Sequence, residues 1–391
     1  MIIKNIEISN YRSLKNLTVP GLTSAVVLHG PNNSGKSNIL LALQTIFAEK
    51  SAGASFTLSD NAVDAKLPLP TRATPFWNGV IADFADNFYM GSSNPIVFSV
   101  QVEVEPTQFK NIKDIGILAV PKAGHRHQFV IKGKIVRAGS DGEMHLSEVS
   151  INNKPLFNRK GENLEWLSSL PASIDSATKQ SLGEAILNQF TGLVFVVPAN
   201  RYLSTETEQQ NREVLASSNF KNWLHWQSLS RAGFNVFKSV QKQLGGKPFN
   251  YGDISFVADG DQIDIMIDDG CGFRMPISQK GTGVQQILVL LGFIATRKAQ
   301  VIAIEEPEVN LSFSNQDELV TTLLQLLLDK ANPVSQILLA SHSDHVGSRA
   351  ELKRLHVENP TGTETKVRVF TVADKAALFP RSSGLHRTKK K

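Results

Sequence analysis

Residues 30–37 have the types and the spacing of a loop that holds phosphate. The segment reads Gly-Pro-Asn-Asn-Ser-Gly-Lys-Ser and matches the pattern G-x-x-x-x-G-K-[ST] at every fixed position. Glycines allow backbone N–H groups to curve around the phosphates of a nucleotide, and a lysine neutralises their charge. We therefore expect Lys36 to contact the phosphates of ATP and the Ser37 hydroxyl to bind Mg²⁺. The residues expected to contact ATP here are Gly30, Asn32, Asn33, Ser34, Gly35, Lys36, Ser37 and Asn38.

Carboxylates end an apolar segment at residues 301–308, which reads Val-Ile-Ala-Ile-Glu-Glu-Pro-Glu. An uninterrupted apolar run is typical of a parallel strand covered on both faces, and ligands of such sheets bind beyond the carboxyl ends of the strands. We predict that Glu305 binds Mg²⁺ and that Glu306 is the general base that acts on the attacking water. The alternative is a strand that ends in a solvated acidic turn.

A histidine follows another apolar segment, residues 336–340, which reads Gln-Ile-Leu-Leu-Ala and continues as Ser-His-Ser. Leucine and valine at helical spacing in residues 319–327 predict a helix of the kind that connects parallel strands. His342 should then lie at the same sheet edge as the first loop and the acids, where we expect it to hydrogen-bond the γ-phosphate. For the nearby His345 a structural role is favoured.

A second glycine-containing loop occupies residues 278–283 and reads Ser-Gln-Lys-Gly-Thr-Gly. Apolar residues at helical spacing follow it, so the loop opens a helix and presents oriented N–H donors and a hydroxyl to an anion. Because one nucleotide needs only one such loop, the second loop must serve a different nucleotide, or the same kind of nucleotide from the other side. Its candidate contacts are Ser278, Lys280, Gly281 and Gly283.

Strands and helices must position these residues, and the pattern of the chain predicts them. Residues 24–29 read as a buried strand before the first loop, and residues 39–47 as the helix after it. Alternation predicts antiparallel strands over residues 98–105, 129–137 and 145–152. Helices are expected within 206–247, and hairpins over 254–257, 263–267 and 273–277. This combination predicts an α/β fold with a P-loop core sheet, an antiparallel β-subdomain and a helical lobe.

The composition limits the class of protein and its location. A chain of 391 residues suffices for one large domain with insertions, or for two domains. No apolar run reaches the roughly 18 residues needed to span a bilayer, and the first residues lack the features of a signal peptide. Cys271 is the single cysteine, which excludes an intrachain disulfide and fits a reducing cytosol. We therefore expect a cytoplasmic protein. Its net charge of +5 permits nucleic-acid contact without arguing for it.

The order of the motifs resembles that of ABC-type ATPases, which have a phosphate loop, a signature loop, an acid-ended strand, a D-loop and a switch histidine. In that family the signature loop of one subunit closes on the γ-phosphate held by another. The resemblance implies that residues 278–283, from here on the signature loop, bind the ATP of a partner chain in a head-to-head homodimer or a higher homo-oligomer. The segment in the D-loop position departs from the sequence common among relatives, which leaves the roles of Asn310 and Ser312 open.

Three segments resemble the branch of this family that includes RecF, SMC and OLD (overcoming lysogenisation defect) proteins. Residues 6–15 are similar to the opening strand of the branch, and residues 193–201 and the Glu-Glu-Pro-Glu sequence are similar to OLD-type ATPases. The resemblance implies that Arg12 lies at the nucleotide and that Asn200 or Arg201 senses the γ-phosphate and the metal. It also implies one ABC-type domain over residues 1–391. The expected parts are the P-loop lobe with its β-insertion at 1–199, the helical lobe at 200–250, the hairpins and catalytic motifs at 251–350, and C-terminal strands with a basic tail at 351–391.

The resemblance implies an ATPase for which bound ATP is a switch. A stand-alone OLD-like ATPase of this size resembles the sensor subunits of prokaryotic anti-phage systems, whose effector is a separate protein. The first alternative is a RecF-like DNA repair and replication ATPase. An OLD-type nuclease would need a TOPRIM domain with several carboxylates, and Asp344 and Asp374 are the only aspartates after His342, which disfavours it. A transporter ATPase is disfavoured by the large β-insertion.

Basic residues concentrate on one predicted hairpin and leave two interpretations open. They are Lys122, His125, Arg126, His127, Lys132, Lys134 and Arg137. Relatives carry DNA over the joined heads, so contact with nucleic-acid phosphates is one interpretation. A solvated hairpin is the favoured one.

Overall fold

A parallel sheet at the centre of the molecule brings the predicted catalytic segments to one edge. The computed structural model describes residues 1–47, 65–68, 87–109, 126–138, 141–160, 163–199, 201, 203, 219–259, 262–270, 272–296, 299–329 and 332–370. The core sheet has the strand order β11 (Val194–Val197), β15 (Val301–Glu305), β16 (Gln336–Ser341), β3 (Ala25–His29), β17 (Lys353–Glu358) and β18 (Lys366–Val369). The first five strands are parallel and β18 is antiparallel.

The adjacency of β15, β16 and β3 explains how distant motifs meet. The buried residues of β15 and β16 are apolar almost throughout, as expected for central parallel strands. The carboxyl end of β15 leads into the acids, that of β16 into His342, and that of β3 into the phosphate loop. The expected strand, loop and helix around the phosphate loop are confirmed, because α1 (Lys36–Ile46) follows directly.

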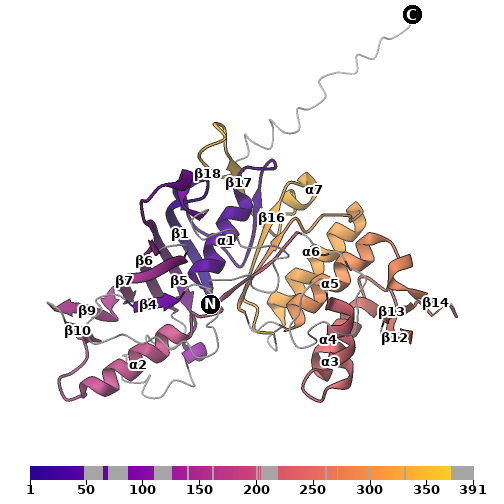
Figure 1. The fold of residues 1–391 in the computed structure, drawn as a ribbon, viewed down its shortest axis with the longest axis horizontal. Helices are drawn as coiled ribbons and strands as arrows, with labels where there is room; N and C mark the ends of the chain where they lie inside the picture. Colours follow the sequence, from indigo (N-terminus) through magenta and orange to yellow (C-terminus); the bar gives the residue numbers. More distant parts are fainter. Residues whose placement is uncertain are drawn as a thin grey trace, which may run out of the picture.

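An antiparallel sheet packs on the other side of α1 (Figure 1). Its order is β2 (Leu14–Val19), β1 (Ile2–Tyr11), β5 (Ile96–Val104), β6 (His127–Ala138), β7 (Asp141–Ile151) and β4 (Ala65–Pro68), with β8 (Lys154–Pro155) beside β7. This sheet confirms the three antiparallel strands that alternation predicts. The neighbouring β9 (Phe157–Lys160), β10 (Asn163–Trp166) and α2 (Ser176–Asn188) complete this lobe. Its apolar core is continuous with one face of the parallel sheet.

Helices and a three-stranded sheet cover the opposite face of the core sheet (Figure 1). The elements are α3 (Phe220–Leu229), α4 (Phe234–Gly245), α5 (Thr282–Thr296), α6 (Phe313–Leu328) and the sheet β12 (Asp253–Asp259), β13 (Gln262–Asp268) and β14 (Arg274–Pro276). The expected helical segment thus contains α3 and α4, while residues 204–218 lie outside the described residues. Short elements are α7 (Asp344–Gly347), η2 (Tyr89–Gly91), η3 (Pro106–Phe109) and η6 (Ile277–Gln279).

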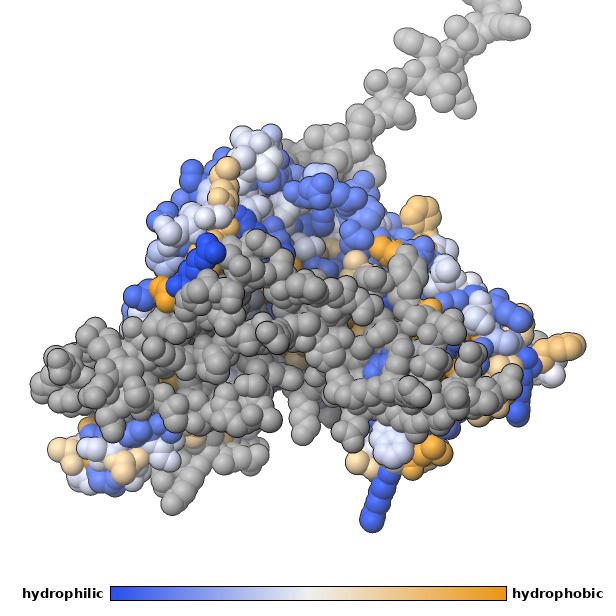
Figure 2. Space-filling view, in the orientation of Figure 1, coloured by the Kyte–Doolittle hydropathy of each residue, from blue (hydrophilic) through white to orange (hydrophobic). Residues whose placement is uncertain are grey.

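The surface on the side shown in Figure 2 is mostly polar where it is described, with apolar residues in small separate groups. Exposed apolar residues of the helical lobe include Trp226, Leu229 and Phe234. In the described part of the chain, every helix is too short or too polar to cross a bilayer.

Candidate nucleotide-binding and hydrolysis site

The phosphate loop is shaped by two glycines that leave no room for a side chain. Gly35 has φ 98°, a left-handed conformation that favours glycine, and a Cβ there would overlap the Thr365 hydroxyl. A Cβ on Gly30 would overlap the backbone carbonyl of Val357 in β17. The loop therefore depends on close contact with the strand pair β17 and β18, which is far away in sequence.

Lys36 is folded back onto the phosphate loop. Its ammonium donates hydrogen bonds to the carbonyls of Gly30 at 2.8 Å and Pro31 at 2.7 Å. Burial lowers the pKa of the Lys36 ammonium, although the carboxylates of Glu306 and Glu308 oppose the shift. A buried cation beside phosphate-sized space is well placed to exchange its carbonyl partners for phosphate oxygens.

A pocket of about 470 Å³ adjoins this loop and contains most of the predicted nucleotide contacts. Its lining residues are Ser13, Asn32, Asn33, Ser34, Gly35, Lys36, Ser37, Asn38, Glu306, Ala340, Asn359 and Gly362. Four of them were not foreseen, namely Ser13 from the turn after β1, Ala340 of β16, and Asn359 and Gly362 from the turn between β17 and β18. Gly30 contributes its carbonyl to Lys36. The lining is polar, as a triphosphate requires.

Glu305 and Ser37 form a donor set that fits Mg²⁺. The Glu305 side chain is buried, and its Oε1 has no hydrogen-bond partner among the residues that the structure describes. Burial raises the pKa of the Glu305 carboxyl, while a hydrogen bond from Ser37 opposes the shift. Mg²⁺ bound here would neutralise Glu305 and screen the charge of the phosphates.

Glu306 lines the pocket and has an unusual backbone conformation. Its φ is 43°, in the left-handed region, and its N–H donates to the Ala340 carbonyl of β16 at 2.8 Å. Such outliers in non-glycine residues persist where the surroundings impose them, often at functional sites. The bend carries the residue out of β15 and into the pocket lining.

The structure places Arg201 behind the acids rather than in the pocket. Its buried guanidinium donates to the carbonyls of Pro198 (2.7 Å), Glu305 (2.9 Å) and Glu306 (3.0 Å), and to the Gln286 side chain of α5 at 3.1 Å. These contacts fix the end of β15 to the helix that follows the signature loop. A sensor role for Arg201 stays a prediction, and Asn200 lies outside the described residues.

Arg12 lies at the edge of the pocket, next to the start of α1. Its Nε donates to the Asn87 side chain at 2.9 Å, and one guanidinium nitrogen lies 3.5 Å from the Asn38 amide oxygen. Asn38 in turn donates to the Ser13 hydroxyl at 2.8 Å. The predicted proximity of Arg12 to the nucleotide is thus compatible with its position.

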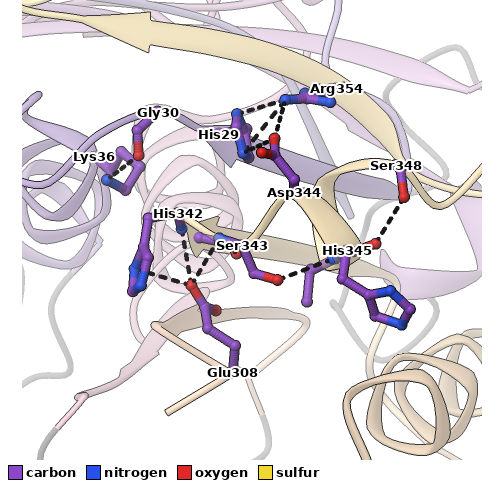
Figure 3. A network of polar contacts seen from close by, with 12 residues as sticks. His29, Gly30, Lys36, Glu308, His342, Ser343, Asp344, His345, Ser348 and Arg354 are labelled. Carbon is purple, nitrogen blue, oxygen red and sulfur yellow. Dashed lines mark hydrogen bonds and ion pairs between the residues drawn. The ribbon is translucent and has the colours of Figure 1, made fainter. Parts of the chain in front are cut away.

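His342 follows β16 and lies on the same side of the sheet as Lys36 (Figure 3). Its ring is partly exposed, and Nδ1 lies 3.1 Å from the Glu308 carboxylate. A second pocket, of about 710 Å³, adjoins it and is lined in part by His345 and Phe313. His345 stacks on Phe313 at 5.0 Å and pairs with Asp317 at 3.0 Å, which suits the structural role favoured for it.

A polar cluster underlies the phosphate loop at the end of β3 (Figure 3). The buried His29 accepts a hydrogen bond from Arg354 at 2.7 Å through Nδ1, so its Nε2 carries the hydrogen that faces Asp344 at 3.2 Å. Burial, followed by the charge of Arg354, lowers the pKa of His29 to about 4. His29 is therefore a neutral link between β3, α7 and β17.

The signature loop does not line the pocket of its own chain. Ser278 and Gly281 are exposed, and Lys280 lies 3.5 Å from the Asp269 carboxylate. Gly283 packs on the D-loop, because a Cβ there would lie 2.9 Å from the Asn310 carbonyl. The D-loop residue Ser312 caps α6 by accepting from the Asn315 N–H at 3.3 Å. The structure thus separates the two glycine loops within one chain.

The basic hairpin has cations that are already paired. Lys132 lies 2.8 Å from the Glu148 carboxylate, and Arg126 lies 3.4 Å from Glu103 and 3.1 Å from Glu105. Lys122 and His125 lie outside the described residues. These ion pairs favour the solvated hairpin over a nucleic-acid surface.

Comparisons with known proteins agree with this geometry. The profile of the AAA ATPase domain matches residues 1–114 and 156–346. A Helicobacter pylori (strain ATCC 700392 / 26695) protein described as an ATP/GTP phosphatase is 21% identical over 350 residues, which cover 88% of this chain and 85% of the relative.

Two solved Smc head domains share the fold at low sequence identity. One, from Pyrococcus furiosus, has an extended coiled coil and is bound to the C-terminal domain of ScpA. It gives a TM-score of 0.51 at 12% identity and covers 97% of this chain and 98% of its own. Another, bound to the C-winged helix domain of ScpA, gives 0.50 at 14% and covers 97% and 100%. Because the profile matches more than half of the chain, this protein belongs to the AAA ATPase domain family, and it shares the fold of the Smc head domains.

Proposed function

We propose that this ATPase is a switch in which two copies join head to head around two ATP molecules. The observation that carries the proposal is the position of the signature loop, which is exposed and does not line the pocket of its own chain. The start of α5, a helix of 15 residues, presents N–H donors beside this loop. A triphosphate held in the pocket of a second copy is the anion that such a loop would suit.

Within each composite site, the residues of one chain would bind and activate while the partner closes the site. Lys36 would hold the β- and γ-phosphates, and Ser37 and Glu305 would hold Mg²⁺. Glu306 would accept a proton from the attacking water, and His342 would contact the γ-phosphate. Such phosphoryl transfer depends on positioning and charge stabilisation, so an incomplete site would be slow.

The proposal further assigns the protein to prokaryotic anti-phage defence, as the sensor or regulatory ATPase that acts with a separate effector. This assignment is supported by the resemblance of residues 193–201 and 305–308 to OLD-type ATPases, and of residues 6–15 to the branch that includes RecF, SMC and OLD proteins. Cells that carry the native locus should plate phage less efficiently than cells whose locus encodes Lys36→Ala. Equal plating for every phage tested would remove the defence assignment and leave the ATP switch intact.

The dimer itself is tested with Ser278→Arg. A bulky cation on the exposed loop should block docking on the nucleotide of the partner, because the loop could no longer approach the γ-phosphate. We expect the variant to bind ATP as a monomer and to show no ATP-dependent dimer in size-exclusion chromatography with light scattering. The matched control is Ser173→Arg, at an exposed serine in the turn before α2. A Ser278→Arg dimer as stable as the wild-type dimer would contradict the proposal.

A further inference from the structure

One carboxylate oxygen next to the hydrolysis site has three nitrogens as partners (Figure 3). Oε1 of Glu308 accepts from the backbone N–H of His342 at 2.8 Å and from that of Ser343 at 3.2 Å. The same oxygen lies 3.1 Å from Nδ1 of the His342 ring. Glu308 therefore contacts both the main chain and the side chain of the switch histidine.

Glu308 is itself held rigidly, which a positioning group requires. Its side chain is 5% exposed, against 43% for the His342 ring. Its carbonyl accepts from the Leu311 N–H at 3.0 Å, within the turn that follows β15. The donor ring is thus the more exposed partner of the pair, and the acceptor is buried in the turn that follows β15.

The carboxylate also determines which ring nitrogen of His342 carries hydrogen. An ionised carboxylate only accepts hydrogen bonds, so Nδ1 of His342 must be the donor. In the neutral ring Nε2 then carries no hydrogen and can accept from the attacking water, whereas it can donate to a γ-phosphate oxygen only when the ring is protonated. Without Glu308, a neutral imidazole in water would interconvert freely between its two tautomers.

A second contact ties the same two loops together. The Ser343 hydroxyl donates to the Gln316 side-chain oxygen at 2.9 Å, and the Gln316 amide donates to the Leu311 carbonyl at 3.0 Å. Gln316 lies in α6 and is buried. The loop after β15 and the loop after β16 therefore form one hydrogen-bonded unit, with Glu308 as its charged member.

We propose that Glu308 is a positioning residue that fixes the orientation and the tautomer of His342 for ATP hydrolysis. The inference rests on the proposed function only in so far as His342 acts at the γ-phosphate. Glu308 is buried and does not line the nucleotide pocket, and it acts through the ring that it holds.

The first experiment compares kcat and KM for Glu308→Gln, His342→Ala and the double variant. Glutamine keeps the size of the side chain but is a weaker, neutral acceptor. We expect kcat of Glu308→Gln to fall roughly 10- to 100-fold, as for a misplaced catalytic group. The double variant should be no slower than His342→Ala within about twofold, because both changes remove one function. Additive losses in the double variant would overturn the proposal.

The matched control is Asp317→Asn, which makes the same chemical change in the neighbouring carboxylate–histidine pair with His345. It should leave kcat within about twofold, since His345 packs on Phe313 and is given no role at the γ-phosphate. The charge of Glu308 also acts on Lys36. The variant Glu308→Asp separates this effect of charge from the contact with His342. The aspartate keeps the charge but is one methylene shorter. A full rescue of kcat by Glu308→Asp would show that charge at Lys36, not the hold on His342, is what matters.

A spectroscopic readout decides the inference independently of hydrolysis. In protein labelled with ¹⁵N-histidine, the His342 signals are identified by their loss in His342→Ala. At alkaline pH the wild type should show mainly the Nδ1–H tautomer, and Glu308→Gln should show a mixture. An unchanged tautomer in Glu308→Gln would refute the positioning role. If His342→Ala hydrolyses ATP like the wild type while the tautomer still depends on Glu308, then Glu308 positions His342 but the proposed role of His342 in hydrolysis is wrong.

Discussion

At the scale of single residues, the backbone bend at Glu306 brings its carboxylate into the pocket, which a regular strand would not do. The left-handed bend at φ 43° turns its side chain into the pocket, while the preceding Glu305 stays buried. The two neighbouring carboxylates therefore have different surroundings, one suited to a metal and the other to a water molecule. Such a division of environments is how adjacent acids acquire different roles.

Replacing Glu306 by glutamine should separate binding from turnover. The amide keeps the size of the side chain but cannot accept a proton, so phosphate release should fall roughly 10²- to 10⁴-fold. ATP affinity, measured by calorimetry, should stay within a few-fold, because Lys36 and the loop are untouched. The control is Glu184→Gln in α2, which leaves the pocket lining intact. Turnover at the wild-type rate in Glu306→Gln would exclude Glu306 as the general base.

At the scale of elements, the neutral His29 joins β3, α7 and β17 beneath the phosphate loop. The charged and titratable groups that act on it are Arg354, Asp344, His356 and Lys36. Its pKa is lowered from 6.5 to about 4, so between these values the unfolded chain binds a proton that the folded chain does not. By linkage, stability is full above pH 6.5 and falls as the pH drops towards 4.

The expected loss from His29 is roughly 2 kcal/mol or less between pH 7 and pH 5. Urea unfolding of the wild type and of His29→Gln at several pH values measures it. Other groups, such as the buried N-terminal amine, also titrate in this range, and the difference between the two proteins removes their contribution. The slope of stability against pH should be smaller in His29→Gln. Parallel curves for the two proteins would show that His29 titrates normally in the folded state.

The two glycine loops should respond differently to the same substitution. In Gly35→Ala the new methyl would meet Thr365 and the left-handed backbone would be strained, so unfolding free energy should fall by roughly 1–3 kcal/mol. Gly281 has open space around its Cβ position and no positive φ, so Gly281→Ala should leave stability of the single chain unchanged within about 0.5 kcal/mol. Denaturant midpoints of the nucleotide-free proteins provide the test. A similar loss in both variants would contradict the packing seen at Gly35.

The catalytic strands could be predicted from the sequence because central parallel strands are apolar without interruption. Those runs, at β15 and β16, place the acids and His342 at strand ends, and the sheet makes the ends neighbours. The contribution of Asn359 and Gly362 to the pocket could not be predicted, since the pairing of β17 with β3 leaves no local signal. Nor does sequence distinguish an arginine that senses phosphate from one that, like Arg201, holds backbone carbonyls in the buried interior.

At the scale of the whole molecule, the two glycine loops belong to different lobes around one sheet. The phosphate loop lies between β3 and α1, and the signature loop lies at the start of α5 on the helical side (Figure 1). The D-loop lies beside the signature loop, because Gly283 packs on the Asn310 carbonyl. A second copy related by two-fold symmetry can present its signature loop to the first pocket while receiving the reverse contact.

A mixing experiment tests this composite site directly. Lys36→Ala removes the phosphate-binding cation of one pocket and leaves the signature loop intact, whereas Ser278→Arg blocks the signature loop and leaves the pocket intact. Each variant alone should be inactive, because two copies of the same variant cannot complete either site. In a mixed dimer, the pocket of the Ser278→Arg chain faces the signature loop of the Lys36→Ala chain, so one complete site is restored.

Because neither variant should form an ATP-dependent dimer with itself, every dimer in the mixture should be mixed, with one complete site of two, so the mixture should recover at most about one half of wild-type activity. Steady-state phosphate release at a fixed total protein concentration measures this recovery. The control replaces the Lys36→Ala chain by one that carries both substitutions, which can complete no site and should restore nothing. If the mixed dimer forms with ATP yet the mixture stays as inactive as that control, one site does not suffice or the loop serves its own chain. Single-turnover hydrolysis by the mixed dimer, purified through two different affinity tags, separates these outcomes, because only a site shared between chains can turn over once.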